Sequence, residues 1–392
     1  MAKCIAVVNA GSSSVKFGFY DSEGEETLLL RGAVEQIGVS PTLSASDGEG
    51  NDVVERNWPS DGFTHAQAMT AVLEVAREHL PEGSTIVGVG HRVVHGGTQF
   101  AGPAQVTSDV ISVLEGFSPL APLHQPHNLA PIKAIAENRP DIPQVACFDT
   151  AFHQTQPHLA QAYALPRELS DEGIKRYGFH GLSYDFVSSR LREIAPDHAD
   201  KRIIIAHLGN GASVCAIEKG KSVATTMGFT AVEGLMMGTR CGSIDPGVLI
   251  YLMDEKGMDA RAIESLVYKK CGLLGVSGIS SDMRTLRQSD DPRAKEAIDL
   301  FIYRIVREIG SLAAALGGID GLVFTGGIGQ RDAKTRREVA AGCSWLGAEL
   351  DETRNSGAEG PISTDNSKLP MWVVQTDEEL VIARQTAAVL GI

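Results

Sequence analysis

The sequence predicts a two-domain α/β protein in which one folding unit occurs twice. A β-branched run, a polar tip and an alternating strand form a β-hairpin pattern at residues 5–20, and the pattern recurs at residues 202–219. Two similar hairpins about half a chain apart indicate duplication. The length of 392 residues also suits two domains better than one. We place the first domain at residues 1–149 with 382–392, and the second at residues 150–381.

The tips of both hairpins resemble anion-binding loops. The first tip contains Gly11 and three serines before Lys16, and the second contains Asn210 and Gly211. Successive turn N–H groups can surround an anion without a helix N-terminus. An ordinary polar turn is the alternative for either tip alone, because glycine and serine are common turn residues. Together with a third glycine cluster at residues 322–329, two such loops facing each other could hold a polyphosphate between two domains.

The other elements follow from periodicity and from helix-breaking residues. Residues 21–60 are polar and turn-rich, and we expect an exposed loop at residues 44–51. Apolar periodicity predicts helices at 64–80, after Pro126, at 183–194, at 292–316 and at 378–390. Pro292 suits a first helical position, and Gly317 suits a C-terminal cap. Apolar runs predict strands at 86–94, at 144–148 and at 321–325, the last followed by a turn at Gly326 and Gly327.

The composition restricts the classes of partner and the compartment. The net charge is −14 without any Lys/Arg block, which argues against nucleic acid or an anionic membrane surface as a partner. The six cysteines lie far apart without a C-x-x-C pair, which argues against a zinc site or a disulfide framework. No apolar stretch approaches the ~20 residues of a membrane span, and the N-terminal apolar run is broken at Asn9, too early for a signal peptide. We therefore expect a soluble cytoplasmic protein.

Several common catalytic motifs are missing from the sequence. It has no G-x-x-x-x-G-K-[ST] and no G-x-G-x-x-G, which weakens the P-loop and dinucleotide-binding interpretations. It also lacks G-x-S-x-G and H-E-x-x-H, against an α/β-hydrolase or a zinc protease.

Five polar residues in apolar or glycine-rich surroundings remain as candidates for chemistry: Arg92, Asp149, His180, Arg240 and Glu378. Each has an ordinary alternative: an ion-paired arginine, a core histidine, or an acid that caps a helix or occupies its first turn. As a set, they supply the positive charge and the metal ligand that phosphoryl transfer requires. Arginine also suits the bidentate grip of a carboxylate.

The motifs also resemble a known family along nearly the whole chain. NAGSSSVKF, GHRVVHGG, LAPLH, FDTAFHQT, YGFHG, HLGNGASV, EGLMMGTRCG, GISSDMR, FTGGIG and EELVIAR occur in the order and spacing of the acetate kinase (acetokinase) family, from residue 3 to about residue 388. The resemblance implies a two-domain, actin-like (ribonuclease H-like) fold with a nucleotide cleft between the domains. It also implies ATP/ADP as cosubstrate, Mg²⁺ (with Mn²⁺ as an alternative), and a homodimer.

The resemblance implies a role for each matching residue. Asn9 and Glu378 match the magnesium site, Arg92 matches the carboxylate-binding arginine, and Asp149, His180 and Arg240 match the catalytic positions. The pocket for the acetate methyl group matches Val94, Leu123, Phe179 and Ala231, with His124 beside it. The first phosphate loop matches Ser12, Ser14 and Lys16, and the second phosphate loop matches His207, Leu208, Gly209, Asn210 and Gly211. The contacts on the adenosine side of the nucleotide match Asp282, Met283, Arg284, Gly327, Ile328, Gly329, Gln330 and Arg331.

Some positions depart from the usual pattern of that family. Gln125 replaces asparagine, and Leu182 and Tyr184 replace the usual threonine and histidine of GFHGTSH. Gln330 and Arg331 replace the glutamate and asparagine of GGIGENS, which leaves the base preference open. Ala231 replaces proline and would widen the methyl pocket, so propionate is the alternative acid.

The expected reaction is the reversible, direct in-line transfer of the γ-phosphoryl group of ATP to acetate. A carboxylate is already ionised at pH 7, so Asp149 is expected to organise Mg²⁺, its waters or the arginines rather than to accept a proton. We keep two rival classes: a non-catalytic actin-like ATP-binding module, and a phosphatase that uses water in place of the acid.

Overall fold

The computed structural model describes residues 3–11, 13–24, 27–59, 62–122, 124–357 and 359–392, and these divide into two compact units. Unit 1 consists of Met1–Phe152 and Asp377–Ile392, and unit 2 of His153–Thr376. The unit boundaries therefore follow residues 152 and 376, where the sequence suggested 149 and 381. The second boundary differs because the last helix, α16 (Glu378–Leu390), packs as a whole on strands of unit 1.

Unit 1 contains a mixed sheet with the strand order β5-β4-β3-β2-β1-β6-β8-β7. Its elements are β1 (Lys3–Ala10), β2 (Val15–Asp21), β3 (Leu28–Glu35), β4 (Thr42–Asp47), β5 (Asp52–Asn57), α1 (His65–His79), β6 (Thr85–Val93), β7 (Ala104–Gln105), α2 (Ser108–Gly116), η1 (Ser118–Leu120), α3 (Gln125–Asn138), β8 (Gln144–Phe148), η2 (Ala151–Thr155, which runs into unit 2) and α16. The predicted first hairpin is confirmed, with β1 antiparallel to β2 and Asn9 opposite Lys16.

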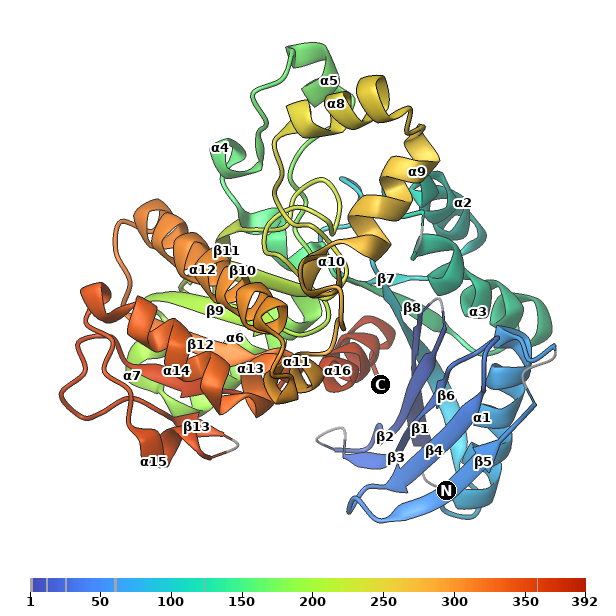
Figure 1. The fold of residues 1–392 in the computed structure, drawn as a ribbon. Helices are drawn as coiled ribbons and strands as arrows, with labels where there is room; N and C mark the ends of the chain where they lie inside the picture. Colours follow the sequence, from blue (N-terminus) through green and yellow to red (C-terminus); the bar gives the residue numbers. More distant parts are fainter. Residues whose placement is uncertain (1–2, 12, 25–26, 60–61, 123, 358) are drawn as a thin grey trace. The chain divides into compact units, whose positions relative to one another are not determined.

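Both faces of this sheet are covered. The helices α1 and α3 contact one face (Figure 1). On this face, alternate residues of β1 to β4 form an apolar core with α1. The helix α16 contacts β1, β6 and β8 on the other face, so closely that a Cβ at Gly90 would lie 2.6 Å from Ile382 Cγ2. A side chain at this position would therefore separate the helix from the sheet.

The expectation of an exposed loop at residues 44–51 was wrong. Strands β3, β4 and β5 extend the sheet through this region, and only residues 48–51 form a turn. In β4 the buried Leu43 and Ala45 alternate with exposed serine, which is the pattern of a half-buried strand. Serine and aspartate on the outer face concealed this alternation.

Unit 2 repeats the central topology with the strand order β11-β10-β9-β12-β14-β13. Its elements are α4 (His158–Gln161), α5 (Arg167–Asp171), α6 (Gly181–Ile194), α7 (Pro196–Ala199), β9 (Arg202–Leu208), β10 (Ala212–Glu218), β11 (Lys221–Thr225), α8 (Pro246–Lys256), α9 (Ala260–Ser265), η3 (Leu266–Lys270), α10 (Gly272–Ser277), α11 (Met283–Gln288), α12 (Pro292–Ala315), β12 (Gly321–Thr325), α13 (Gly326–Arg331), α14 (Ala333–Gly342), η4 (Ser344–Leu346), α15 (Glu352–Asn355), β13 (Gly360–Pro361) and β14 (Met371–Val373).

The duplication predicted from the hairpins is visible in the pairing of the strands. In unit 1, the β1–β2 hairpin is followed by parallel pairing of β1 with β6 and of β6 with β8. In unit 2, the β9–β10 hairpin is followed by parallel pairing of β9 with β12 and of β12 with β14. Each unit thus brings a hairpin tip to the carboxyl end of the neighbouring parallel strand, which is where α/β sheets usually carry their sites.

The long helix α12 lies across β9, β10 and β11 (Figure 1). It begins at Pro292 as predicted, and Gly317, with φ of 68°, follows its C-terminal cap.

The prediction of a turn at Gly326 and Gly327 was wrong, because these glycines open helix α13. Gly326 has a φ of 76°, and a Cβ there would lie 2.7 Å from Leu208 O, so the close approach to β9 explains the glycine. Among the described residues, no helix is both long and apolar enough to span a bilayer.

Candidate active site

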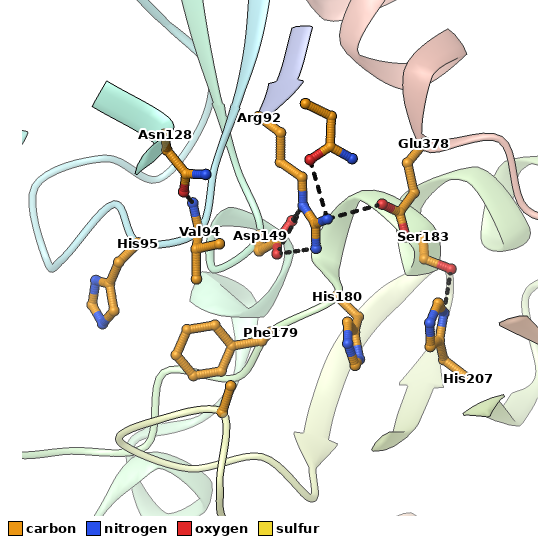
Figure 2. Close-up of polar contacts among 12 residues, drawn as sticks. Arg92, Val94, His95, Asn128, Asp149, Phe179, His180, Ser183, His207 and Glu378 are labelled. Atoms are coloured by element: carbon orange, nitrogen blue, oxygen red, sulfur yellow. Dashed lines mark hydrogen bonds and ion pairs between the residues drawn. The ribbon is translucent and has the colours of Figure 1, made fainter. Parts of the chain in front are cut away.

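In unit 1, the ion pair between Arg92 and Asp149 joins the carboxyl ends of two neighbouring parallel strands. Arg92 lies near the end of β6, opposite Cys147 in β8, and Asp149 follows β8 directly. Arg92 Nε donates to Asp149 Oδ1 at 3.0 Å and Nη2 donates to Oδ2 at 2.7 Å (Figure 2). Asp149 is 2 % exposed. Both carboxylate oxygens therefore hold the guanidinium in one orientation.

The other terminal nitrogen of this guanidinium faces the two predicted metal ligands. Arg92 Nη1 lies 3.5 Å from Asn9 Oδ1 and 3.6 Å from Glu378 Oε2. Asn9 lies near the end of β1, and Glu378 is the first residue of α16. Four predicted residues therefore meet, although they are far apart in sequence. Burial alone lowers the pKa of Arg92, but Asp149 and Glu378 more than reverse this effect and hold the pKa above its usual value. The guanidinium stays charged at every relevant pH.

The residues around Val94 are fixed by an asparagine that the sequence analysis missed. Val94 N–H donates to Asn128 Oδ1 at 3.0 Å (Figure 2). Asn128 Nδ2 donates to the carbonyl oxygen of Ala10 at 2.6 Å. Asn128 lies one helical turn after His124, the N-terminal cap of α3. Its spacing from this predicted pocket residue was the signal in the sequence that could have identified it. The unusual Gln125 is fully buried and donates to the carbonyl oxygens of His95 and Leu114, so it acts in packing.

The first hairpin tip is held by its own backbone and by a contact from outside the hairpin. Gly11 N–H donates to Ser14 O at 2.8 Å, and His65 Nε2 lies 2.7 Å from Gly11 O. The exposed Lys16 lines a cavity of about 270 Å³ together with Tyr20, Arg31, Asp377 and Glu379. Of the predicted residues, Ser12 and Leu123 lie outside the described residues.

In unit 2, His180 is held by the second hairpin. It occupies the N-terminal cap of α6 with a φ of 60°, a left-handed conformation that is rare for residues other than glycine. Its Nδ1 lies 2.8 Å from Ser213 Oγ, and its ring stacks on His207 with centroids 4.3 Å apart. Ser183 Oγ in turn lies 2.8 Å from His207 Nδ1 (Figure 2). A strained backbone conformation persists only where the surrounding contacts enforce it, and it often marks a functional position.

The second hairpin tip approaches both predicted phosphoryl-stabilising groups. A Cβ added to Gly211 would lie 3.3 Å from His180 Nε2 and 3.6 Å from Arg240 Nη1. On the other side of the tip, a Cβ at Gly238 would lie 2.1 Å from Asn210 Oδ1, and Gly238 N–H donates to Asn210 O at 3.0 Å. The backbone of the tip therefore fits closely between the segments that carry His180 and Arg240.

A partly buried polar cluster holds the segment that contains Ala231. Arg176 Nη2 donates to Glu233 Oε1 at 2.6 Å, and the hydroxyl of Tyr163 donates to the other carboxylate oxygen. Phe229 N–H donates to the Tyr163 hydroxyl at 2.9 Å. Phe179, also expected in the methyl pocket, is 2 % exposed, and its carbonyl oxygen lies 2.9 Å from His153 Nε2. The sequence analysis missed Tyr163, Arg176 and Glu233.

The predicted adenosine-side residues lie on α11 and α13. Asp282 caps α11 and pairs with Arg284 through contacts of 2.6 to 3.2 Å, while Met283 is buried. On α13, Gln330 Nε2 lies 3.4 Å from Thr325 Oγ1, and the side chain of Arg331 is exposed.

Two arginines that the sequence analysis missed hold these helices. Arg336 is 2 % exposed and donates to Gly329 O at 2.9 Å, to Gln330 O at 2.7 Å and to Asn355 Oδ1 at 2.8 Å. Arg287 of α11 reaches Glu338 of α14 through two contacts of 2.6 and 2.8 Å, and it also contacts Asp332 at 3.2 Å. The predicted nucleotide segments are therefore cross-linked to each other and to α14.

The fold and these clusters define a class: a two-domain α/β protein that repeats one hairpin unit and has arginine, histidine and carboxylate groups at strand ends and beside a hairpin tip. The sequence model of the acetokinase family matches residues 4–384. An acetate kinase of Rhodopseudomonas palustris is 52 % identical over 390 residues, which is 98 % of each chain. The chain therefore belongs to the acetokinase family.

Two solved structures agree with this assignment. The crystal structure of Porphyromonas gingivalis acetate kinase matches with a TM-score of 0.88 at 42 % identity and covers 99 % of this chain and 100 % of that one. A propionate kinase from Francisella tularensis matches with a TM-score of 0.90 at 36 % identity, covering 98 % and 99 %. The predicted actin-like fold class is confirmed. Family membership makes the protein an ATP-binding kinase that phosphorylates a carboxyl group.

Proposed function

We propose that this enzyme transfers the γ-phosphoryl group of ATP to acetate in a reversible reaction that yields acetyl phosphate and ADP. The observation that carries the proposal is the orientation of Arg92, whose guanidinium is held by both oxygens of Asp149 and is partly buried. A fixed, permanently charged guanidinium suits the carboxylate of a small acid. The acetate kinase names of the close relatives support acetate as that acid.

The contacts of Asp149 support an organising role for this residue. Both of its oxygens accept hydrogen bonds from Arg92, so neither is poised to accept a proton from the substrate. Acetate needs no general base, because it is already ionised near neutral pH. The attacking carboxylate oxygen forms a bond to the γ-phosphorus while the bond between that phosphorus and the bridging oxygen of ADP breaks.

Asn9 and Glu378 fit the proposed role of magnesium ligands. Their side-chain oxygens, Asn9 Oδ1 and Glu378 Oε2, both lie within 3.6 Å of Arg92 Nη1, so they face one point. Mg²⁺ prefers oxygen ligands and commonly uses one or two protein groups with waters and substrate phosphates. When bound there, the ion would neutralise phosphate charge.

His180 and Arg240 are proposed to stabilise the phosphoryl group in transfer. Both lie beside the backbone of Gly211 in the second hairpin tip, where loop N–H groups would meet phosphate oxygens. Phosphoryl transfer spreads negative charge over the equatorial oxygens, so positioned donors and cations lower its barrier. Arg92 would meanwhile orient the acid.

Propionate is the alternative acid. Ala231 leaves more room than proline would, and one of the similar structures is a propionate kinase. A pocket of this kind discriminates against one extra methylene by only about 1–3 kcal/mol. Both acids are therefore expected to react, with acetate preferred.

We also propose that the protein is a cytoplasmic homodimer. Helix α8 and the segment before it expose several large apolar side chains, an unusual concentration for the surface of a soluble protein: Ile244, Val248, Ile250, Tyr251 and Met253. A second copy of the chain would cover such a face. Sedimentation equilibrium would test the dimer, and charged substitutions on α8 should dissociate it.

The decisive experiment measures ATP consumption with Mg²⁺ and acetate, propionate or butyrate while hydroxylamine traps the acyl phosphate. Acid-dependent acyl hydroxamate, largest with acetate, is the expected result. Loss of ATP without hydroxamate would identify a phosphatase, and no loss of ATP would identify a binding module.

A further inference from the structure

Three side chains of unit 2 form a continuous hydrogen-bonded chain that ends at His180. The hydroxyl of Tyr184 lies 2.5 Å from Ser213 Oγ, and the same Ser213 Oγ lies 2.8 Å from His180 Nδ1. Tyr184 follows His180 by one helical turn on α6, while Ser213 comes from β10. Tyr184 and Ser213 are fully buried, so this chain is enclosed.

Ser213 can donate only one proton along this chain, because a hydroxyl has one hydrogen and two lone pairs. In one arrangement, Tyr184 donates to Ser213 and Ser213 donates to His180 Nδ1. The imidazole proton then resides on Nε2. In the other arrangements, Ser213 either donates to Tyr184 or accepts from both neighbours. In each of them His180 Nδ1–H donates to Ser213, and Nε2 is left as an acceptor.

The location of His180 Nε2 favours the first arrangement. This atom would lie 3.3 Å from a Cβ on Gly211, so it faces the loop proposed to hold phosphate. Ionised phosphate oxygens only accept hydrogen bonds, and a neutral imidazole can donate to them only through Nε2–H. Burial raises the pKa of the Tyr184 hydroxyl far above its usual value, so that this group keeps its proton and can act as the donor.

We propose that Tyr184 and Ser213 are positioning residues that set the tautomer of His180, so that Nε2–H points to the transferring phosphoryl group. The inference rests on the proposed role of His180 in phosphoryl transfer. It also gives a function to a departure from the usual family pattern, which has histidine where this chain has Tyr184. The tyrosine hydroxyl always has a proton to donate, whereas a ring nitrogen of a neutral histidine at this position would donate in one tautomer and could only accept in the other.

The tautomer can be measured directly by nitrogen NMR, independently of activity. The full-length protein would be labelled with ring-¹⁵N histidine, and the His180 signals would be identified among the 11 histidines by their loss in His180→Asn. At pH 8 we expect the shift of a protonated Nε2 and an unprotonated Nδ1. A protonated Nδ1 with an unprotonated Nε2 in the native enzyme would overturn the proposal, whether or not the enzyme phosphorylates acetate.

The matched variants are Tyr184→Phe and Tyr177→Phe. Both remove a buried phenol hydroxyl from unit 2, but Tyr177 donates to the backbone carbonyl oxygen of Gly173 at 2.8 Å and has no part in the chain. Tyr184→Phe should mix the His180 tautomers and lower kcat about tenfold, the rate equivalent of one buried hydrogen bond. Tyr177→Phe should leave the tautomer unchanged.

Ser213→Ala and Ser213→Thr complete the test. The alanine variant should lose the single tautomer, and the threonine variant, which keeps a hydroxyl, should restore it. If Tyr184→Phe fails to fold, the serine pair still decides the matter. A single, unchanged Nε2–H tautomer in Ser213→Ala would overturn the proposal. A native enzyme that shows the Nε2–H tautomer but no acid-dependent ATP turnover would count against the proposed function alone.

Discussion

Arg240 Nη1 donates a hydrogen bond to the backbone carbonyl oxygen of Ala231 at 3.0 Å. The contact joins the arginine proposed to stabilise the phosphoryl group to the residue proposed to line the pocket for the acid. Because Tyr163, Arg176 and Glu233 fix the segment around Ala231, they also fix Arg240 indirectly. Changes to the acid pocket are therefore expected to alter turnover as well as the affinity for the acid.

Arg240→Ala should reduce kcat by about 10³-fold or more, because an arginine that neutralises the transferring phosphoryl group is worth at least that factor. ATP binding, measured by calorimetry, should be retained. Arg337→Ala is the matched control, since this arginine pairs with Glu352 on an exposed part of the same unit. A loss of less than tenfold in Arg240→Ala would contradict the assigned role.

Ala231→Pro should sharpen the preference for acetate. Proline adds volume beside the proposed methyl group but keeps the carbonyl oxygen that Arg240 contacts. The ratio of kcat/KM for acetate to kcat/KM for propionate should rise by about 10-fold or more, consistent with the energy of one methylene in a tight pocket. Steady-state kinetics with both acids measure the ratio. An unchanged ratio would show that Ala231 does not border the acid.

Arg287→Ala should weaken nucleotide binding with little effect on the acid. Its side chain joins α11 to α14 through Glu338 and Asp332, so its loss would separate the two segments proposed to hold adenosine. We expect KM for ATP to rise about tenfold, because a bidentate, partly buried ion pair contributes on the order of 1–2 kcal/mol. KM for acetate should stay within about twofold.

The control for this prediction is Arg293→Ala. Arg293 pairs with Asp291, the N-terminal cap of α12, so this ion pair lies at the start of a single helix. It should change neither KM. Equal effects of the two substitutions on KM for ATP would show that the Arg287 cross-link does not position the nucleotide segments.

The sequence predicted the parts of the site that lie at strand ends and hairpin tips. Arg92 and Asp149 follow apolar runs that any strand prediction finds, and parallel pairing then brings them together. The residues that hold the site were missed: Tyr163 meets Glu233 across 70 residues, and Arg287 meets Glu338 across 51. Such contacts arise between irregular segments or helix surfaces, where no periodic pattern marks a half-buried arginine or tyrosine.

The buried His91 should make the enzyme sensitive to acid. His91 is 1 % exposed, its Nε2 lies 2.8 Å from Gln144 Oε1, and its Nδ1 is buried without a hydrogen-bond partner in the described part of the chain. Burial lowers its pKa from 6.5 to about 4, and the contact with Gln144 opposes this only in part. The folded protein thus keeps His91 neutral where the unfolded chain is protonated.

The stabilisation from a neutral His91 is fully present above pH 6.5 and is lost as the pH falls towards 4, because the unfolded state then binds the additional proton. A shift of this size corresponds to roughly 3 kcal/mol at most. His91→Leu removes the titrating group. Urea unfolding at pH 7.5 and pH 4.5 should therefore show a smaller loss of stability on acidification in His91→Leu than in the native protein. Because each protein is compared with itself at two pH values, a packing defect that lowers stability equally at both does not affect the result. Identical losses of unfolding free energy in the two proteins would show that another group causes the acid sensitivity.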